Sequence, residues 1–246
     1  MERDFRKGYV EIDFAVEPFG SPLRVLWRSL RMFLENLAFI AAATLAVFLP
    51  GKLLLQGLCA ALDISPDGVL GYMLMTASDL LLSAWAVPAV IFGMAMRMRT
   101  GRPAPLGESL RWGRRQWGKA LWNMFQVQVT VLLYALLLFV PGIMAFVRLS
   151  LVDPIVALEA DQRSDVLDRS KRLTEGHRWR IFAVVLPLGV LDLVMGFVVL
   201  NAVEKAANSR FLLAIADSVL AVTSHWMTLA LLLVYLPLAA GRQVKR

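Results

Sequence analysis

The sequence is poor in the residues from which catalytic and metal sites are built. It has one cysteine and two histidines in 246 residues, so no intramolecular disulfide can form and few nitrogen or sulfur ligands exist for a metal. His-Glu-x-x-His, Gly-x-Ser-x-Gly and Cys-x-x-Cys motifs are absent, and Gly51-Lys52 lacks the rest of a phosphate-binding loop. We therefore expect no cofactor and no metal, and no motif supports an enzyme.

Charge is scarce as well. Charged residues make up 18% of the chain and hydrophobic residues 58%, whereas a soluble domain typically has about 25% charged and 45–50% apolar residues. This composition argues against an ordinary soluble domain and, more firmly, against a disordered chain. Acidic side chains among the first 20 residues also argue against a secretory signal peptide.

The apolar residues gather in six segments that approach the length of about 20 residues needed to span a membrane. The segments are residues 32–50 (with an extension past Pro50-Gly51 to 62), 71–96, 120–140, 142–158, 181–201 and 211–240. Pro141-Gly142 suits the central positions of a type II turn, which predicts a hairpin of the third and fourth segments. The alternative is one kinked helix and five spans in total.

The basic residues favour six spans. The chain carries a net charge of +7, and 22 of its 26 Lys and Arg residues lie in residues 1–31, 97–119, 163–180 and 242–246. These four stretches fall on one side of the membrane only if there are six spans. The positive-inside rule then places both termini in the cytoplasm. Because the basic residues follow the loops and form no nucleic-acid-binding module, we expect no nucleic-acid partner.

Each pair of spans follows a stretch with helical amphipathicity: residues 21–34, 105–119 and 164–173. The residues expected on the apolar faces are Leu23, Leu26, Trp27, Leu30 and Phe33, then Leu106, Leu110 and Trp117, then Val166, Leu167, Ser170 and Leu173. The predicted fold is thus all-α, with six transmembrane helices in three hairpins and interfacial helices on the cytoplasmic side. Residues 1–20 form a cytoplasmic tail, 21–240 the membrane domain and 241–246 a basic tail.

Interfacial helices hold basic and Trp side chains among lipid headgroups. The residues predicted to contact headgroups are Arg24, Trp27, Arg28, Arg31, Arg114, Arg115 and Trp117. The alternative interpretation of these helices is simple anchoring and control of topology.

Residues 139–182, FVPGIMAFVRLSLVDPIVALEADQRSDVLDRSKRLTEGHRWRIF, carry a resemblance to a known family. They are similar to the core of bacterial polytopic membrane proteins related to YciC and to the membrane domain of some glycerophosphodiester phosphodiesterases. The matching positions are Pro141, Gly142, Arg148, Pro154, Glu159, Ser170, Leu173, Gly176 and Trp179. The resemblance implies a six-helix membrane protein without the separate catalytic barrel of those phosphodiesterases.

Ionisable residues inside spans are costly and mark candidate functional sites. At 1.5 Å per residue, Asp79, Arg148, Asp192 and Asp217 fall at similar depths in the outer half of the bilayer. We predict that Arg148 pairs with one or more of the three aspartates. The cluster is either an ion pair that fixes helix register or the lining of a polar cavity for a proton, an ion or a headgroup.

A second polar group is expected at the cytoplasmic interface, where Asp153 and Glu159 end the fourth span and Arg169 and Arg172 follow. A Glu159–Arg169 or Glu159–Arg172 bridge is predicted there. Gly176 is expected to end the intervening helix in the left-handed region. His225 is expected to be a buried, hydrogen-bonded imidazole rather than a metal ligand.

These features leave three classes of function open. The first is an accessory or structural subunit of a membrane assembly. The second is a lipid or small-solute transporter, or a lipid-handling protein, that uses an intramembrane charged cavity. The third is a membrane enzyme. The expected partners are the lipid bilayer and either other membrane proteins or a second copy of the chain.

Overall fold

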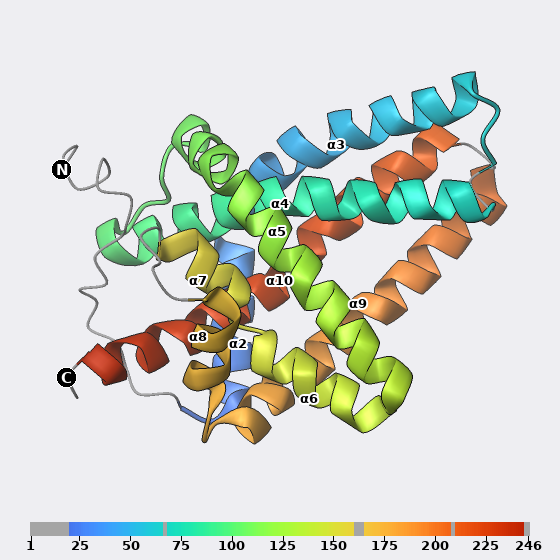
Figure 1. Ribbon diagram of the computed structural model, residues 1–246. Coiled ribbons are helices and arrows are strands. Elements are labelled where there is room, and N and C mark those ends of the chain that lie inside the picture. Colours follow the sequence, from blue (N-terminus) through green and yellow to red (C-terminus); the bar gives the residue numbers. More distant parts are fainter. Residues whose placement is uncertain (1–19, 66–67, 160–164, 208–209, 244–246) are drawn as a thin grey trace.

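A computed structural model describes residues 20–65, 68–159, 165–207 and 210–243. Within these residues the chain forms helices and no strands, so the all-α prediction is confirmed (Figure 1). The helices are α2 (Pro22–Glu35), α3 (Leu37–Ala61), α4 (Val69–Thr100), α5 (Leu106–Leu137), α6 (Phe139–Leu149), α7 (Val152–Leu158), α8 (Val166–Thr174), α9 (Arg178–Ala207) and α10 (Arg210–Gln243).

Five stretches of the described chain are long and apolar enough to cross a membrane: Leu37–Ala61, Val69–Thr100, Val140–Leu158, Arg178–Val203 and Phe211–Ala240. They indicate a multi-pass membrane protein. Helix α5 is not among them; its first half carries Arg and Lys, and its second half is free of charge. The predicted third span, residues 120–140, is therefore not one of the five.

The first predicted span is divided differently in the structure. Helix α2 ends at Glu35, and Asn36 interrupts the helical structure. Helix α3 then continues without interruption through Pro50 to Ala61. Membrane helices tolerate an internal proline because neighbouring groups compensate for the missing hydrogen bond. As a consequence, Lys52 lies inside α3 and is buried, not in an outer loop as the sequence pattern suggested.

Helices α4 and α5 approach one another closely at Gly113. A Cβ atom added there would lie 2.4 Å from the carbonyl oxygen of Trp85, so only glycine allows this contact. The indole of Trp112, which stacks on Phe92 at 4.9 Å between ring centroids, donates 2.9 Å to the carbonyl of Ala157.

The predicted buried side of residues 105–119 is therefore only partly right. Leu110 packs against the core as predicted, but Trp112 is buried, whereas Leu106 and Trp117 are substantially exposed. The stretch is also not a separate interfacial helix, because α5 continues unbroken to Leu137.

The chain reverses between α5 and α6 at Leu138, not at Pro141-Gly142. Leu138 has extended backbone angles (φ −162°, ψ 144°), and Pro141 and Gly142 lie in the first turn of α6. The predicted type II turn is thus corrected, because proline fits the first helical turn, where its missing N–H costs no hydrogen bond. Gly142 instead allows close packing, since a Cβ there would lie 2.9 Å from Cα of Ala135.

Two hydroxyl groups of α8 form hydrogen bonds to the end of α6. Ser170 Oγ donates 2.8 Å to the carbonyl of Arg148, and Thr174 Oγ1 lies 3.5 Å from the same oxygen. Ser170 and Leu173 are buried as predicted. Gly176 has φ +81°, which confirms the predicted left-handed end of this helix.

The core surrounds the second half of α4, in which nearly every residue from Ala84 to Met96 is buried. Helix α10 packs on α2, α3 and α9, while much of the surface of α9 is exposed. We call the end at which α4 finishes, with Arg97 and Arg99, the basic end; the far end is where α3 finishes and α4 begins. In Figure 1 the far end lies to the right, and α7, α8 and the close of α10 lie to the left.

Candidate functional site

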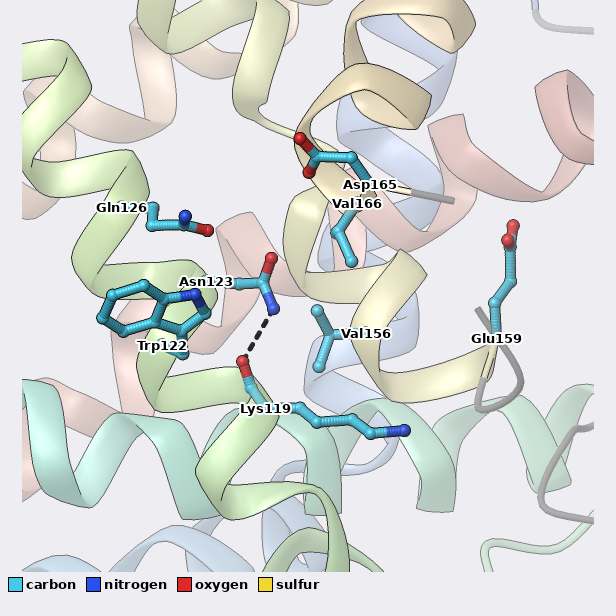
Figure 2. Close-up of a pocket in the computed structure, with 8 residues that line it drawn as sticks. All are labelled: Lys119, Trp122, Asn123, Gln126, Val156, Glu159, Asp165 and Val166. Atoms are coloured by element: carbon cyan, nitrogen blue, oxygen red, sulfur yellow. Dashed lines mark hydrogen bonds between the residues drawn. The ribbon is translucent and has the colours of Figure 1, made fainter. Parts of the chain in front are cut away.

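A pocket of about 340 Å³ lies between α5 on one side and α7 and the start of α8 on the other (Figure 2). Its lining combines one basic, two acidic, two amide, one indole and two aliphatic side chains: Lys119, Glu159, Asp165, Asn123, Gln126, Trp122, Val156 and Val166. The lining thus mixes polar and apolar surface and carries charges of both signs.

Helix α5 presents its part of the pocket as a single stripe. Lys119, Trp122, Asn123 and Gln126 are spaced by three and four residues and so share one helix face. Asn123 Nδ2 donates 2.8 Å to the carbonyl of Lys119, as Figure 2 shows, and Trp122 is 60% exposed. Lys119 is the last charged residue before the charge-free second half of α5.

The opposite wall is built from the end of one helix and the start of the next. Val156 belongs to α7, and Glu159 follows its last residue. Asp165 is the N-cap of α8, where its Oδ1 accepts 3.0 Å from the backbone N–H of Leu167. The pocket therefore lies where α7 ends and α8 begins.

Glu159 is the most connected side chain of this wall. Its Oε2 lies 2.5 Å from Nε of Arg169, and its Oε1 accepts 2.8 Å from Nη2 of Arg169 and 2.6 Å from the hydroxyl of Tyr235 on α10. The hydrogen bond to Glu159 raises the pKa of the Arg169 guanidinium, so Arg169 stays positively charged. The predicted Glu159–Arg169 bridge is confirmed.

The contacts of Glu159 given above do not include the other two members of the predicted interface group. Asp153 lies in the first turn of α7. Arg172 is exposed on α8. The basic partner of Glu159 is thus Arg169.

Helix α2 has three distinct faces. Val25, Ser29 and Phe33 are buried, and Ser29 Oγ accepts 2.9 Å from the indole N–H of Trp226 on α10. At 100° per residue, a second face about 140° away carries the apolar but exposed Leu23 and Trp27. The predicted single apolar face is thus split between residues that contact protein and residues that face outward.

The third face of α2 carries charge. Arg24, Arg28 and Arg31 lie on it and are exposed. On α5, Arg114 and Arg115 are exposed too, and Trp117 is 40% exposed while its indole donates 2.9 Å to the carbonyl of Leu81. All seven residues predicted to contact headgroups are therefore accessible at the surface.

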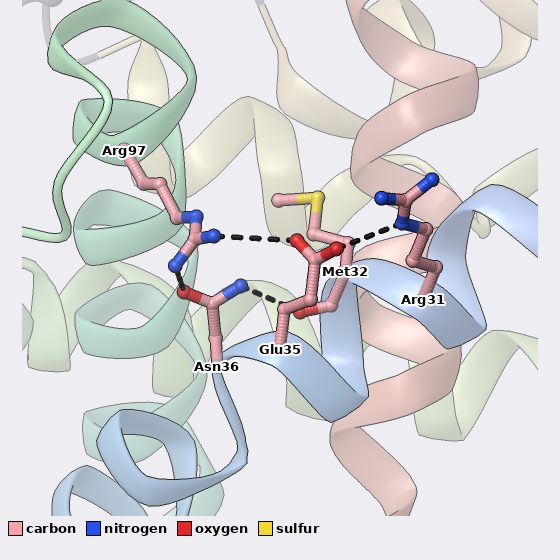
Figure 3. Close-up of polar contacts among 5 residues, drawn as sticks. All are labelled: Arg31, Met32, Glu35, Asn36 and Arg97. Carbon is pink, nitrogen blue, oxygen red and sulfur yellow. Dashed lines mark hydrogen bonds and ion pairs between the residues drawn. The ribbon is translucent and has the colours of Figure 1, made fainter.

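A polar network ties the end of α2 to α4 (Figure 3). Arg97 donates to Oδ1 of Asn36 and, at 3.3 Å, to Oε2 of Glu35, whose Oε1 accepts 2.8 Å from Arg31. Asn36 Nδ2 in turn donates 2.6 Å to the carbonyl of Met32. This network fixes the break between α2 and α3 and so sets the direction of α2.

The charge cluster within the predicted spans forms around a different cation than the one predicted. Lys52 Nζ lies 2.5 Å from Oδ1 of Asp79 and 2.5 Å from Oδ2 of Asp217, a group that we call the lysine triad. No ion pair within the described chain joins Arg148 to these aspartates: α6 packs on α5, α8 and α9, whereas Asp79 and Asp217 lie on α4 and α10. The predicted Arg148 pairing is thus wrong, while the prediction that Asp79 and Asp217 share one layer is confirmed.

The remaining buried ionisable groups stand apart. Asp192 is half-buried on α9 and belongs to no ion pair of the described chain. His225 is buried, with Nδ1 at 3.5 Å from Oγ1 of Thr228. No group of three or more His, Cys, Asp or Glu residues within the described ranges could hold a metal ion.

Sequence reasoning missed three members of these clusters. Lys52 was assigned to a loop because Pro50-Gly51 resembles a helix end, and Lys119 was counted only as a topological charge. Tyr235 gave one usable signal, the one hydroxyl in the otherwise apolar residues 229–240 near the basic end of α10.

No family model, curated protein or solved structure matches the chain. The resemblance of residues 139–182 to YciC-like proteins therefore stays a prediction.

Proposed function

We propose that the chain crosses a bacterial inner membrane six times with its basic end in the cytoplasm. The charge-free second half of α5 supplies the additional crossing. It pairs with the crossing formed by α6 and α7, and Gly142 of α6 packs closely on Ala135 of α5. The location of the basic residues supports this orientation by the positive-inside rule.

We further propose that the protein binds the headgroup of a phospholipid from the cytoplasmic leaflet in the pocket between α5, α7 and α8. One observation carries this proposal: the pocket lies at the depth where two apolar runs end. Lys119 immediately precedes the charge-free part of α5, and Glu159 immediately follows the apolar stretch Val140–Leu158. Phosphate and amine groups of lipids occupy this depth of a bilayer.

The lining favours a headgroup with charges of both signs. The Lys119 ammonium suits a phosphate, and the carboxylates of Asp165 and Glu159 suit a primary ammonium. The exposed indole of Trp122 has the amphipathic character typical of the interface. A volume of 340 Å³ is at the small end for ligand sites, which fits a headgroup better than a whole lipid. A phospholipid with a phosphoethanolamine headgroup is therefore the proposed ligand.

Helix α2 supports the same function by lying in the interface. Its outward apolar face, with Leu23 78% and Trp27 69% exposed, has no protein cover in the described chain. Arginines line the adjacent face, as in helices that insert one side into a leaflet while basic groups stay among headgroups. Because Arg97 and Ser29 fix its direction, α2 is held as a rigid part of the membrane surface.

The experiment compares lipids and isosteric variants in the purified full-length protein. Phosphatidylethanolamine should raise the unfolding temperature by about 5–10 °C at a hundredfold excess over Kd, and phosphatidylglycerol, which lacks the ammonium, should raise it less. Asp165→Asn keeps an N-cap acceptor but removes the charge, so it should abolish the preference between the two lipids. Lys119→Gln should weaken the response to both.

Asp168→Asn is the matched control, because it removes the same charge from an exposed residue of α8 outside the pocket. Equal stabilisation by both lipids in the unsubstituted protein, or a loss of preference in Asp168→Asn as large as in Asp165→Asn, would contradict the proposal.

A second candidate is an accessory subunit of a membrane assembly, and the exposure of α9 favours it. Leu193 and Phe197 are 73% and 70% exposed, and added Cβ atoms at Gly189 and Gly196 would meet no atom within 4 Å. Apolar helix faces with small residues allow close helix–helix contact in membranes. Site-specific crosslinking from Phe197 in the native membrane tests it: a discrete protein adduct supports an assembly, and lipid adducts alone oppose it.

A further inference from the structure

The lysine triad has an unbalanced charge. Lys52 contributes +1, and Asp79 and Asp217 contribute −1 each when ionised, which leaves −1 in a site whose ammonium is 99% buried. An uncompensated charge in apolar surroundings is strongly unfavourable. Lys52 Nζ already occupies the space between the two carboxylates. The remaining negative charge is therefore best neutralised by a proton bound to one of the carboxylate oxygens.

A second observation shows that the site lacks a hydrogen-bond donor. Gln56 follows Lys52 by four residues on the same face of α3, and its side chain is buried. Its Nε2 reaches Sδ of Met75, which precedes Asp79 by four residues on α4, at 3.8 Å. The amide therefore lies between α3 and α4 directly beyond the Lys52–Asp79 contact. Its Oε1 is buried and has no hydrogen-bond partner among the described residues.

The carboxylates, unlike the ammonium, reach the surface of the protein. The side chains of Asp79 and Asp217 are 48% and 33% exposed, against 1% for Lys52. Lys52 lies nine residues before the end of α3, which places the triad about 14 Å from the far end. The carboxylates are thus the part of the lysine triad that a proton can reach from outside the protein.

We propose that the lysine triad is a proton-binding site, in which one proton is held on Asp79 or Asp217 while Lys52 stays charged. The proton forms an O–H bond to a carboxylate oxygen, no bond to a heavy atom breaks, and the group becomes neutral. A protonated carboxyl is a hydrogen-bond donor. In the proposed site it donates to Oε1 of Gln56, directly or through one water. The site neither requires nor leaves room for a metal cation, because the ammonium fills that position.

Other titratable groups on the surrounding helices are few, which makes the site testable. Lys52 is the only charged residue of α3, and between the helix ends α4 carries Asp79 as its only charge. The remaining titratable groups on α3 and on the spanning parts of α4 and α10 are Cys59, Tyr72, His225 and Tyr235. Neighbouring α9 carries Asp192 in its middle, Arg178 and Arg180 near its start, and Glu204 and Lys205 near its end.

The test is infrared difference spectroscopy of the full chain in lipid vesicles, read at the C=O stretch of a protonated carboxylic acid during a pH titration. The unsubstituted protein should show one such band at neutral pH. Asp79→Asn and Asp217→Asn each leave one carboxylate beside Lys52, a neutral pair that needs no proton, so both should lack the band. Asp192→Asn, the matched control on α9, should keep it.

Three outcomes would overturn the proposal. One is the absence of a protonated carboxyl in the unsubstituted protein, which needs no variant to fold. Another is a band that disappears on addition of Na⁺ at constant pH, which would assign the site to a metal cation. Retention of the band in both triad variants together with its loss in Asp192→Asn would place the proton on α9 and contradict it too.

Discussion

The hydroxyl of Tyr235 donates a hydrogen bond of 2.6 Å to Oε1 of Glu159, which links the buried face of α10 to the wall of the pocket. The same carboxylate is held by Arg169 from α8. Glu159 has therefore two fixed partners on two helices, and its position relative to Asp165 and Lys119 does not depend on the loop that follows it. This arrangement preorganises the acidic side of the proposed headgroup site.

Tyr235→Phe should destabilise the protein, since it removes a buried hydrogen bond to a charged acceptor without creating a large cavity. We expect a loss of about 1.5–3 kcal/mol in the free energy of unfolding, measured by denaturation in mild detergent. Tyr134→Phe is the control, because Tyr134 is 47% exposed on α5 and should change the free energy by less than about 0.5 kcal/mol. Equal effects of the two variants would show that the Tyr235–Glu159 bond does not contribute.

Two glycines of α5 should respond to alanine with opposite signs. Gly113→Ala places a methyl group against the Trp85 carbonyl, and such overpacking costs typically about 1–3 kcal/mol. Gly118→Ala meets no atom within 4 Å and should stabilise the helix by up to about 1 kcal/mol through helix propensity. Thermal unfolding of both variants checks the prediction, and a stabilised Gly113→Ala would refute the close α4–α5 packing.

Arg97→Leu should loosen α2 while leaving the other helices intact. The substitution removes the bonds to Glu35 and Asn36 that fix the break between α2 and α3. Hydrogen exchange of the backbone amides of residues 22–35 should become faster, with little change in α4. Arg99→Leu removes an exposed arginine two residues away on the same helix and should leave α2 protected. Unchanged exchange in Arg97→Leu would mean that packing on α10 alone holds α2.

The proposed sixth crossing can be tested at the α5–α6 turn. Leu138 is 67% exposed, and six crossings place it on the outer face of the membrane. In a Cys59→Ser background, Leu138→Cys should react with a membrane-impermeant maleimide in intact cells, whereas Arg102→Cys should react only after the cells are opened. Labelling of both positions under the same condition would show that α5 does not cross the membrane.

Local patterns predicted those parts of the fold in which the interacting residues are close in sequence. The Glu159–Arg169 bridge and the left-handed Gly176 lie within 20 residues of one another, and helix spacing alone suffices to place them. The shared depth of Asp79 and Asp217 followed from the constant rise of a helix. The triad itself could not be predicted, because the pattern around Pro50 is compatible both with a helix end and with a continuous helix.

Tertiary partners decided the features that sequence patterns placed wrongly. Trp112 was expected away from the buried face, yet it is buried because Ala157, 45 residues later, offers its carbonyl. The apolar stripe of α2 was expected to face one way, yet part of it faces outward because Ser29 and Val25 also contact the core. Hydrophobic periodicity alone does not distinguish burial in protein from burial in lipid.

The proposal that the pocket between α5, α7 and α8 holds a phosphoethanolamine headgroup can be tested by crosslinking. Native membranes are supplied with phosphatidylethanolamine that carries a photoreactive group at its headgroup, and the adducts are identified by mass spectrometry. Adducts are expected on residues 119–126, 156–159 and 165–166, lost in the Lys119→Gln, Asp165→Asn double variant and retained in Asp168→Asn. Adducts spread evenly over the basic end, unchanged in the double variant, would contradict it.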